Sequence, residues 1–454
     1  MDVSVVILAA GQGSRMKSRL PKVLHRVAGV PMARHVYQTA CQFSSDIHLV
    51  VGHGADQVRQ EFSDTAARFW LQAEQLGTGH AVAQAMPGVP ETGAVLVLYG
   101  DVPLTRAETL KTLIEQVSEH TMGLLTVQLD DPAGYGRIVR DASGQVMSIV
   151  EHKDASSEQL AINEVNSGIM AVPAWMLHAW LPRLQNNNAQ GEYYLTDLIS
   201  MAASEGVAVQ AVQPTDVEET LGVNNRQQLA VLERWYQQRA ANALMAEGAT
   251  LMDPARVDIR GTVRVGQDCL IDVNVVFEGE VELGAGVRIG PNCVIRNARL
   301  GDDVVVEANT LIDGAQLGAG ATVGPFARLR PGTELDEGAK VGNFVETKKA
   351  RLGAGSKVNH LSYIGDAIIG DAANIGAGTI TCNYDGVNKF VTDIGAGAFV
   401  GSNSTLVAPV TIEAGAFVGA GSVLTKTAPA DQLTVGRARQ VTVKGWTRPA
   451  KQPQ

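Results

Sequence analysis

The chain has 454 residues, of which 45% are hydrophobic and 19% are charged, so it is long enough for two or three domains and is not globally disordered. The formal net charge of −10 argues against a protein that coats nucleic acid, and no apolar run reaches the roughly 18 residues of a membrane span. Four widely spaced cysteines without a Cys-x-x-Cys pair argue against a disulfide scaffold and a cysteine zinc site. The cysteine pattern fits a reducing compartment, and we expect a cytoplasmic protein. The start of the chain lacks the basic segment of a signal peptide.

The first part of the chain has the pattern of an α/β domain. Apolar or β-branched runs at 3–10, 47–51 and 95–99 predict buried strands, and a helical pattern at 32–43 lies between the first two. Strands that alternate with helices indicate βαβ units and a parallel sheet.

Glycine marks a change of architecture near the middle of the chain. Residues 1–250 contain 19 glycines, whereas the shorter stretch 251–430 contains 27. A long helix is predicted over 224–247, at the boundary between these two compositions. The expected division is a first domain at 1–226, a helical linker at 227–248 and a second domain at 249–454.

The second part of the chain repeats with a period of six. The repeated positions carry Phe or an aliphatic residue in three runs, namely Ile259, Val265, Ile271, Phe277, Leu283, Ile289 and Ile295, then Val305, Leu311, Leu317, Val323, Leu329, Leu335 and Val341, then Ile394, Val400, Leu406, Ile412, Val418 and Leu424. A period of six is typical of a hexapeptide parallel β-helix. In such a prism one aliphatic side chain per hexad points inward, and each coil buries these residues against the next coil.

Two interruptions of this period are informative. The pattern stops at Val341 and resumes at Leu352, and after Ile375 it does not resume until Ile394. The segment 379–391 therefore predicts an insertion, and insertions in a solenoid form loops that often lie on the binding face.

A glycine-rich loop, residues 8–16, follows the first predicted strand. Glycines at this place let backbone N–H groups approach phosphates, although such a turn can also be purely structural. The loop lacks the Gly-Lys-Ser/Thr of a Walker A motif and the third glycine of a dinucleotide-binding fingerprint, which argues against an ATPase and a dehydrogenase. The nearby cations Arg15 and Lys22 favour contact with a triphosphate.

Asp101 follows the predicted strand 95–99, at the edge where open α/β sheets bind ligands. A carboxylate there can hold Mg²⁺ against phosphate oxygens. The alternative is a helix cap or a turn residue.

These features resemble the sugar-nucleotide pyrophosphorylase family. The resemblance is carried by the segments 8–16, 21–22, 72–79, 99–101 and 222–226. With the hexapeptide region included, residues 3–448 resemble the bacterial family of bifunctional N-acetylglucosamine-1-phosphate uridylyltransferases/glucosamine-1-phosphate N-acetyltransferases. Gln12 stands where relatives often carry Lys, so we expect no cationic role there.

The resemblance implies both the fold and the activity. The fold would be a Rossmann-like nucleotidyltransferase domain followed by a left-handed parallel β-helix that forms a homotrimer. Acetyl-CoA would acetylate glucosamine 1-phosphate in the second domain, and UTP would then react with N-acetylglucosamine 1-phosphate in the first. The product, UDP-N-acetylglucosamine, feeds peptidoglycan and lipopolysaccharide synthesis.

The resemblance also implies the residues of the uridylyltransferase site. Arg15 and Lys22 would neutralise phosphate charge, and Asp101 and Asn224 would hold Mg²⁺. The nucleotide would contact Leu8, Ala9, Ala10, Gly11, Gln72, Gly77 and Thr78, and the sugar would be held by Gly136, Glu151 and Asn166. Tyr99 and Gly100 are expected to contact the nucleotide or the sugar. In-line attack of a sugar phosphate on UTP needs positioning and charge neutralisation more than a protein nucleophile.

His360 is the only histidine after His178 and lies between the two interruptions of the hexad pattern. A lone histidine is usually structural or merely exposed, and the cations that precede it can equally form a solvated face. Acetyl transfer to an amino sugar, however, needs a base near neutral pH, for which imidazole is suited. The resemblance makes His360 this general base.

Two further groups of residues are implied in the second domain. Glucosamine 1-phosphate would contact Arg330, Lys348, Tyr363 and Asn374. Acetyl-CoA, lying between subunits, would contact Ala377, Asn383, Tyr384, Ser402, Ala420 and Arg437. The basic tail at 444–451 either closes over this site or is disordered.

Two other functions stay open on the sequence alone. A pyrophosphorylase with one activity would use its solenoid only to oligomerise or to bind a regulator, against which His360 and the insertion argue. A non-catalytic nucleotide-binding assembly protein would release no pyrophosphate. The expected partners are small-molecule substrates and further copies of the chain, with neither nucleic acid nor a membrane.

Overall fold

The structure is a computed structural model that describes residues 1–451, and it divides into two compact units. Unit 1 spans Met1–Tyr236, and unit 2 begins at Gln237. Among the described residues no helix is both long and apolar enough to cross a membrane.

Unit 1 is built on a mixed sheet whose main path runs β11-β7-β10-β6-β1-β4-β5, with β8 and β9 joined at its side. The strands are β1 (Val3–Ala9), β4 (Ile47–Val51), β5 (Arg68–Leu71), β6 (Ala94–Tyr99), β7 (Thr121–Gln128), β8 (Arg137–Arg140), β9 (Val146–Val150), β10 (Glu164–Pro173) and β11 (Ala208–Val212). β1 pairs in parallel with β4 and β6, as the apolar runs predict. β10 runs antiparallel to β6 and β7, so the main path of the expected parallel sheet contains one reversed strand.

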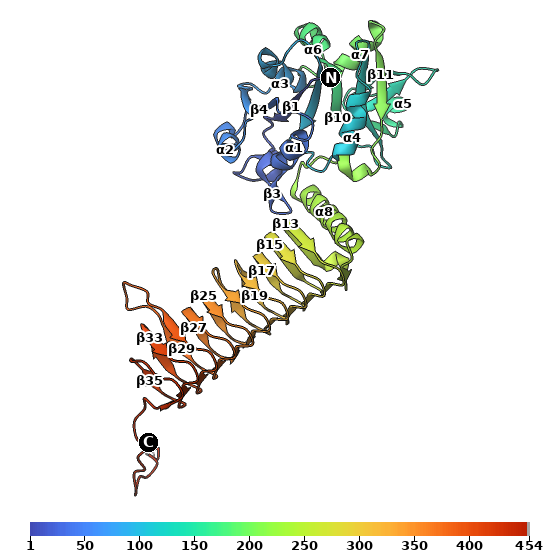
Figure 1. Cartoon of the computed structure of the whole chain (residues 1–454). Coiled ribbons are helices and arrows are strands. Elements are labelled where there is room, and N and C mark those ends of the chain that lie inside the picture. The colour runs from blue at the N-terminus through green and yellow to red at the C-terminus, as the bar shows by residue number, and fades with distance from the viewer. Residues whose placement is uncertain (452–454) are drawn as a thin grey trace. The chain divides into compact units, whose positions relative to one another are not determined.

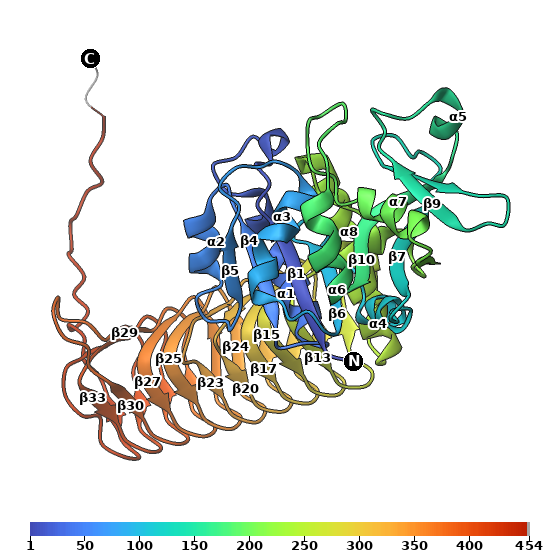
Figure 2. The same cartoon turned by 90° about the horizontal axis from the view of Figure 1, so that it is seen from above.

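Helices cover both faces of this sheet. They are α1 (Met32–Ala40), α2 (Ala55–Glu61), α3 (Thr78–Ala85), α4 (Ala107–Glu115), α5 (Ser157–Leu160), α6 (Ala174–Trp180) and α7 (Asp197–Ser204). Val5 and Ile7 of β1 join a core with α1, α2 and α4, whereas Val6 and Leu8 join a core with α3, α6 and α7. This alternation explains why the whole strand is apolar. The β8–β9 hairpin and α5 stand out at one side of unit 1 (Figure 2).

The chain reverses its direction of travel across the sheet between β1 and β6. It adds β4 and then β5 on one side of β1 and returns to place β6 on the other side. Ligands of open α/β sheets bind at such a switch point, outside the carboxyl ends of the strands.

Helix α8 (Arg226–Ala246) contributes to the cores of both units. Leu232 packs with Met16 and Val27 in unit 1. Ala241 and Leu244 join the core of unit 2.

Unit 2 is a parallel β-helix whose successive coils stack one after another (Figure 1). One sheet contains β12 (Thr250–Leu251), β14 (Leu270–Ile271), β16 (Arg288–Ile289), β18 (Val305–Val306), β21 (Thr322–Val323), β24 (Lys340–Asn343), β26 (Lys357–His360), β28 (Asn374–Ile375), β31 (Phe399–Val400), β34 (Phe417–Val418) and β36 (Leu433–Thr434). The other contains β13 (Val257–Val265), β15 (Val275–Leu283), β17 (Val294–Leu300), β19 (Leu311–Asp313), β20 (Gln316–Leu317), β22 (Arg328–Leu329), β23 (Glu334–Leu335), β25 (Glu346–Leu352), β27 (Tyr363–Ile369), β29 (Ile380–Cys382), β30 (Thr392–Ile394), β32 (Thr405–Val407), β33 (Val410–Ile412) and β35 (Val423–Leu424). The hexad period therefore predicts the architecture correctly.

The residues that point into the prism differ in one place from those that the period of six predicts. Val306 and Ile312 are buried, not Val305 and Leu311, because the column slips by one position before Leu317. The sequence does not reveal this slip, because aliphatic residues are adjacent at 304–306 and at 311–312 and either register fits them.

Threonines fill the two apparent interruptions of the pattern. Thr347 is fully buried in register between Leu329 and Ile364, and Thr381 is buried in the same column beside Leu406. Threonine has nearly the volume of valine, so the column continues where the aliphatic pattern stops. The segment after β29 leaves the stack as a loop (Figure 1). Within this loop Tyr384 forms an antiparallel bridge with Lys389.

One corner of the prism carries a column of residues with left-handed backbone conformations. In the earlier coils these residues are Asn274, Asn292 and Asn309, and in the later coils Gly378, Asn403 and Gly421. In between stand Phe326, Phe344 and Leu361, with φ between 52° and 57° and exposed fractions of 51%, 55% and 63%. Asn and Gly tolerate this conformation, whereas a bulky side chain there costs about 1–2 kcal/mol.

Candidate active sites

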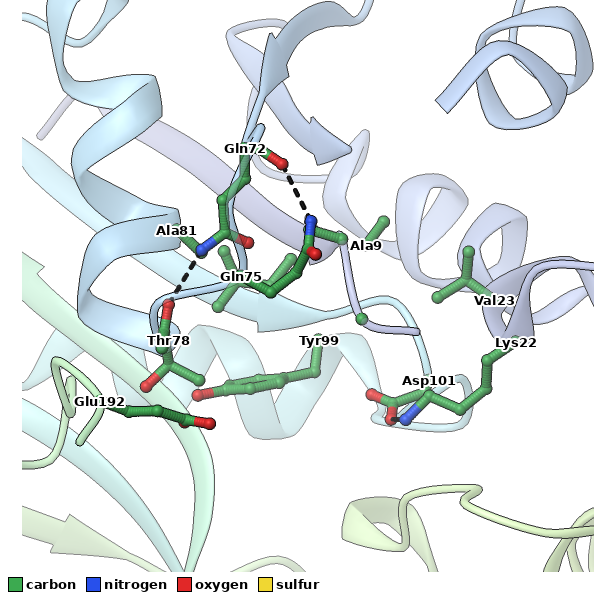
Figure 3. Close-up of a pocket in the computed structure, with 14 residues that line it drawn as sticks. Ala9, Lys22, Val23, Gln72, Gln75, Thr78, Ala81, Tyr99, Asp101 and Glu192 are labelled. Atoms are coloured by element: carbon green, nitrogen blue, oxygen red, sulfur yellow. Dashed lines mark hydrogen bonds and ion pairs between the residues drawn. The ribbon is translucent and has the colours of Figure 1, made fainter. Parts of the chain in front are cut away.

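A pocket of about 300 Å³ opens at the carboxyl ends of β1 and β6, the switch point of the sheet (Figure 3). Leu8 and Tyr99 are partners in the register of these two strands, and Gly100 N donates to Leu8 O at 2.9 Å. The sheet thus brings the glycine-rich loop and the end of the Asp101 strand together. The predicted residues that line the pocket are Leu8, Ala9, Ala10, Gly11, Lys22, Gln72, Gly77, Thr78, Tyr99 and Asp101.

Two glycines are required by the close packing around this pocket. Gly13 has a φ of +61°, and a Cβ there would lie 2.6 Å from Lys22 Cβ. Gly77 has a φ of +113°, and a Cβ there would lie 2.6 Å from the carbonyl oxygen of Tyr193. Only glycine combines this backbone with such close neighbours.

Lys22 contacts oxygen atoms of two side chains at one end of the pocket. Its Nζ forms an ion pair with the Asp101 carboxylate and donates to Asn224 Oδ1 at 3.3 Å. Carboxylate and amide oxygens that converge on one cation form the donor set that Mg²⁺ prefers, usually completed by water and substrate phosphates. Within residues 1–451 no group of three or more His, Cys, Asp or Glu gathers as a metal site.

The ring of Tyr99 occupies the middle of the pocket. In Figure 3 it lies between Thr78 on one side and Asp101 on the other. Burial raises the pKa of the Tyr99 phenol, and the negative charges of Asp101 and Glu151 raise it further. The phenol is therefore neutral at neutral pH and can donate a hydrogen bond.

The three residues expected to hold the sugar meet beside Tyr99. A Cβ on Gly136 would lie 3.4 Å from Glu151 Oε1, and Asn166 N donates to Gly136 O at 2.9 Å. Gly168, two residues after Asn166, has a φ of +88° and lies so close to the Tyr99 ring that a Cβ would approach it to 2.7 Å. Burial raises the pKa of the Glu151 carboxyl.

Several lining residues were not predicted, and six predicted residues lie outside the lining, namely Arg15, Gly100, Gly136, Glu151, Asn166 and Asn224. Val23, Gln75, Ala81 and Glu192 also line the pocket. Gln75 belongs to the segment 72–79 and donates from Nε2 to Gln72 O at 3.1 Å, so that segment could have indicated it. Glu192 comes from a distant loop that no local pattern marks. Arg15 is exposed on the turn Ser14–Met16, and its role stays a prediction.

In unit 2 a second column of residues runs along the corner that carries the left-handed residues. Its members each precede one of those residues: Asn343, His360, Ala377, Ser402 and Ala420. Asn343 and His360 are register partners, Asn403 N donates to Ala377 O at 2.7 Å, and Gly421 N donates to Ser402 O at 2.8 Å. Arg437 Nη1 donates to Ala420 O at 2.8 Å. The stacking thus aligns the predicted base with three residues expected to contact acetyl-CoA, and the side chain of a fourth, Arg437, reaches the last of them.

His360 is exposed at this corner and is not packed inside the prism. Its Nδ1 lies 2.6 Å from Asn343 Oδ1. Nothing in the sequence pattern pointed to Asn343.

Cations gather around the start of β25. Arg330 Nη1 forms an ion pair with Glu346 Oε1 at 2.9 Å, and Tyr363 is the register partner of Glu346. The ammonium of Lys389, from the loop after β29, lowers the pKa of Lys348, and Arg330 adds to this effect. Cations that destabilise one another in this way favour a bound anion such as a phosphate.

The remaining predicted residues occupy other positions. Asn374 lies on β28 as the register partner of Lys357, in the sheet that also contains His360. Asn383 Nδ2 donates to the Asp366 carboxylate, and the side chain of Tyr384 is 58% exposed. The sequence did not indicate Lys389, because it lies in a loop without repeat periodicity.

The comparisons with known proteins agree with the division into two different domains. Residues 5–251 match the MobA-like NTP transferase domain, and residues 262–297 and 392–426 match the bacterial transferase hexapeptide (six repeats). A protein of Marinobacter nauticus named Bifunctional protein GlmU is 59% identical over 98% of this chain and 99% of its own length. The chain belongs to the bifunctional GlmU family.

Other GlmU proteins match equally widely. Those of Pseudomonas entomophila and Stutzerimonas stutzeri are 58% identical over 99% of this chain, and cover 99% and 100% of their own lengths. A nucleotidyl transferase of known structure from Methanothermobacter thermautotroptrophicus covers 52% of this chain and 99% of its own, at 19% identity and a TM-score of 0.39, which is too distant to add to the assignment.

Membership of the GlmU family decides between the functions that the sequence left open. The chain is a bifunctional transferase of cell-wall synthesis, with a nucleotidyltransferase domain and a hexapeptide acyltransferase domain that together make UDP-N-acetylglucosamine. The pyrophosphorylase with one activity and the non-catalytic assembly protein are thereby excluded.

Proposed function

We propose that the pocket of unit 1 binds UTP and N-acetylglucosamine 1-phosphate, with Asp101 and Asn224 holding Mg²⁺. The convergence of these two residues on the Lys22 ammonium carries this assignment. Bound Mg²⁺ would neutralise charge on phosphate oxygens. Leu8–Gly11, Gln72, Gly77 and Thr78 contact the nucleotide, and Gly136, Glu151 and Asn166 contact the sugar.

These residues act by positioning and charge neutralisation. A phosphate oxygen of the sugar phosphate attacks the α-phosphorus of UTP in line, and the bond to pyrophosphate breaks as the new P–O bond forms. Lys22 and Arg15 stabilise negative charge on the phosphates, and the rigid edge of the sheet fixes both substrates in the attack geometry.

His360 acts as the general base of acetyl transfer in unit 2. The amine of glucosamine 1-phosphate attacks the thioester carbonyl of acetyl-CoA, the imidazole takes the proton that the amine loses, and CoA leaves. Arg330, Lys348, Tyr363 and Asn374 bind the sugar phosphate. Acetyl-CoA follows the corner column past Ala377, Ser402, Ala420 and Arg437, with Asn383 and Tyr384 contributed by the loop. The observation that supports this assignment is the alignment of His360 with Ala377, Ser402 and Ala420 in one column at a corner of the prism.

The assembly in this proposal is a homotrimer of left-handed β-helices, with acetyl-CoA between subunits. Phe326, Phe344 and Leu361 support it, because bulky apolar side chains that are both exposed and strained are explained by burial against another copy. Leu361 directly follows His360, so such an interface adjoins the acetyl-transfer site. The four free cysteines support operation in the reducing cytoplasm.

A coupled assay on the purified full-length protein tests these assignments. With glucosamine 1-phosphate, acetyl-CoA, UTP and Mg²⁺, the protein should release both CoA and pyrophosphate. Removing Mg²⁺ with EDTA should stop pyrophosphate release and leave CoA release unchanged. Pyrophosphate release that survives EDTA would refute the metal assignment of Asp101 and Asn224.

A further inference from the structure

The side chain of Asn343 fixes the tautomer of His360. Asn343 Oδ1 lies 2.6 Å from His360 Nδ1. An amide oxygen only accepts hydrogen bonds, so this contact places the ring proton on Nδ1. The lone pair of the neutral ring then lies on Nε2, which is the atom left to take a proton from a substrate.

The backbone holds this pair in place on both sides. Asn343 and His360 are register partners on β24 and β26, and Leu361 N donates to Asn343 O at 3.0 Å. A Cβ on Gly342 would lie 2.0 Å from Asn359 O, so the glycine allows the two strands to approach this closely. The two side chains are therefore neighbours because of coil stacking, and the amide needs no rearrangement to reach the ring.

The contact does little for stability by itself. His360 is exposed and Asn343 is half-buried, and a solvent-accessible hydrogen bond contributes about 1 kcal/mol or less. Among the described residues Nε2 makes no hydrogen bond, so it is available to a substrate. An exposed imidazole without a partner exchanges tautomers and turns about its side-chain torsions, and the amide restricts both motions.

We propose that Asn343 is a positioning residue for acetyl transfer. It holds His360 as the Nδ1–H tautomer, with Nε2 presented to the amine of glucosamine 1-phosphate, and it continues to accept from Nδ1–H in the imidazolium. During the step the amine nitrogen bonds to the acetyl carbon, its proton passes to Nε2, and the carbon–sulfur bond breaks to release CoA as a thiolate, which is then protonated. Asn343 itself stays neutral. This inference rests on the assignment of His360 as the base.

Two substitutions of Asn343 separate positioning from a merely structural role. Asn343→Leu keeps the approximate volume but removes the acceptor, and it should lower kcat of acetyl transfer at least about 10-fold while both KM values stay within about two-fold. Asn343→Asp keeps an acceptor and adds charge, so it should retain most activity and move the acidic limb of the kcat/KM profile to higher pH. Uridylyl transfer by the same protein should be unchanged in both variants and serves as the control.

A double variant distinguishes failure of this inference from failure of the base assignment. Asn343→Leu should have no further effect in a His360→Ala background if the amide works through the ring. The inference is overturned if Asn343→Leu retains wild-type kcat, or if it lowers activity equally with and without His360. Should Asn343→Leu fail to fold, an unmoved pH profile in Asn343→Asp overturns it instead. Full acetyl transfer by His360→Ala alone would refute the base assignment, which is a separate result.

Discussion

Lys22 Nζ lies 3.3 Å from Asn224 Oδ1, and this contact joins two segments that are 202 residues apart in the sequence. The stem of Lys22 packs against Gly13, in the glycine-rich loop. The loop therefore positions the Lys22 ammonium beside Asp101 and Asn224, as well as lining the pocket itself.

Gly13→Ala should impair uridylyl transfer. The new Cβ would lie 2.6 Å from Lys22 Cβ on a backbone with φ of +61°, so the loop or Lys22 must move. We expect a loss of at least about 10-fold in kcat/KM for UTP, because misplacing a group by about 1 Å has large effects. The readout is pyrophosphate release, with acetyl transfer as the internal control. In Gly222→Ala, the matched control in unit 1, the new Cβ meets no atom closer than 3.6 Å, and activity should be retained. Equal activity of the two variants would contradict this role of Gly13.

Thr381→Val should destabilise unit 2 more than Thr347→Val. Thr381 Oγ1 accepts from Gly365 N at 2.8 Å, so its loss leaves a buried N–H unpaired, at a cost of about 1–3 kcal/mol. Thr347 Oγ1 lies 3.0 Å from the hydroxyl of Thr333, which also donates to Arg330 O, so Thr347→Val should cost about 1 kcal/mol or less. Calorimetric midpoints of the two variants measure the difference. Equal midpoints would contradict the stabilising role of the Thr381 hydroxyl.

These two threonines also show which part of the fold could not be predicted from the sequence. The period of six predicts the prism because burial in a stacked coil demands one inward side chain per hexad. It does not predict that Thr347 and Thr381 continue the column, because a polar residue is acceptable there only when a specific partner satisfies its hydroxyl. The reversed strand β10 was missed for a similar reason, since a strand buried on both faces has the same composition in either direction.

The residues of the candidate sites also fall into those that the sequence could predict and those that it could not. Motifs that lie within one segment, such as 8–16 and 72–79, can be recognised because their residues are close together in the sequence. Asn343, Lys389 and Glu192 become site neighbours only through coil stacking or loop placement. No local pattern marks that proximity.

Unit 1 should lose stability in mild acid because of His48. This ring is fully buried, Trp70 Nε1 donates to its Nδ1 at 2.9 Å, and its Nε2 lies 3.1 Å from Asp46 Oδ1. Burial lowers the pKa of His48, although Asp46 opposes this effect. The unfolded chain therefore binds a proton that the folded chain resists, and stability falls as the pH drops below about 6.5.

Calorimetry at about pH 7.5 and pH 5 checks this expectation. In His48→Gln a non-titrating side chain replaces the ring, so the drop in unfolding temperature between the two pH values should be smaller than in the wild type. An equal drop in both proteins would show that other groups cause the acid sensitivity.

Phe344→Asn should weaken the assembly without harming the fold of a single chain. Asn tolerates the left-handed backbone at this position, so the substitution relieves about 1–2 kcal/mol of strain while it removes an exposed apolar ring. Sedimentation velocity should show smaller species than for the wild type, and acetyl transfer should fall with dissociation. Val231→Asn, at an exposed apolar position on α8, is the matched control and should sediment like the wild type. Unchanged sedimentation of Phe344→Asn would contradict the proposed interface.

The most direct measurement follows CoA and pyrophosphate in parallel for the wild type, Asp101→Asn and His360→Ala, each supplied with the substrates of both reactions. Asp101→Asn should release CoA at the wild-type rate and lose about 10²-fold of its pyrophosphate release. His360→Ala should release pyrophosphate normally from added N-acetylglucosamine 1-phosphate and lose about 10²–10⁴-fold of its CoA release. If either variant lost release of both CoA and pyrophosphate, or of neither, the claim that two separate active sites use these two residues would be contradicted.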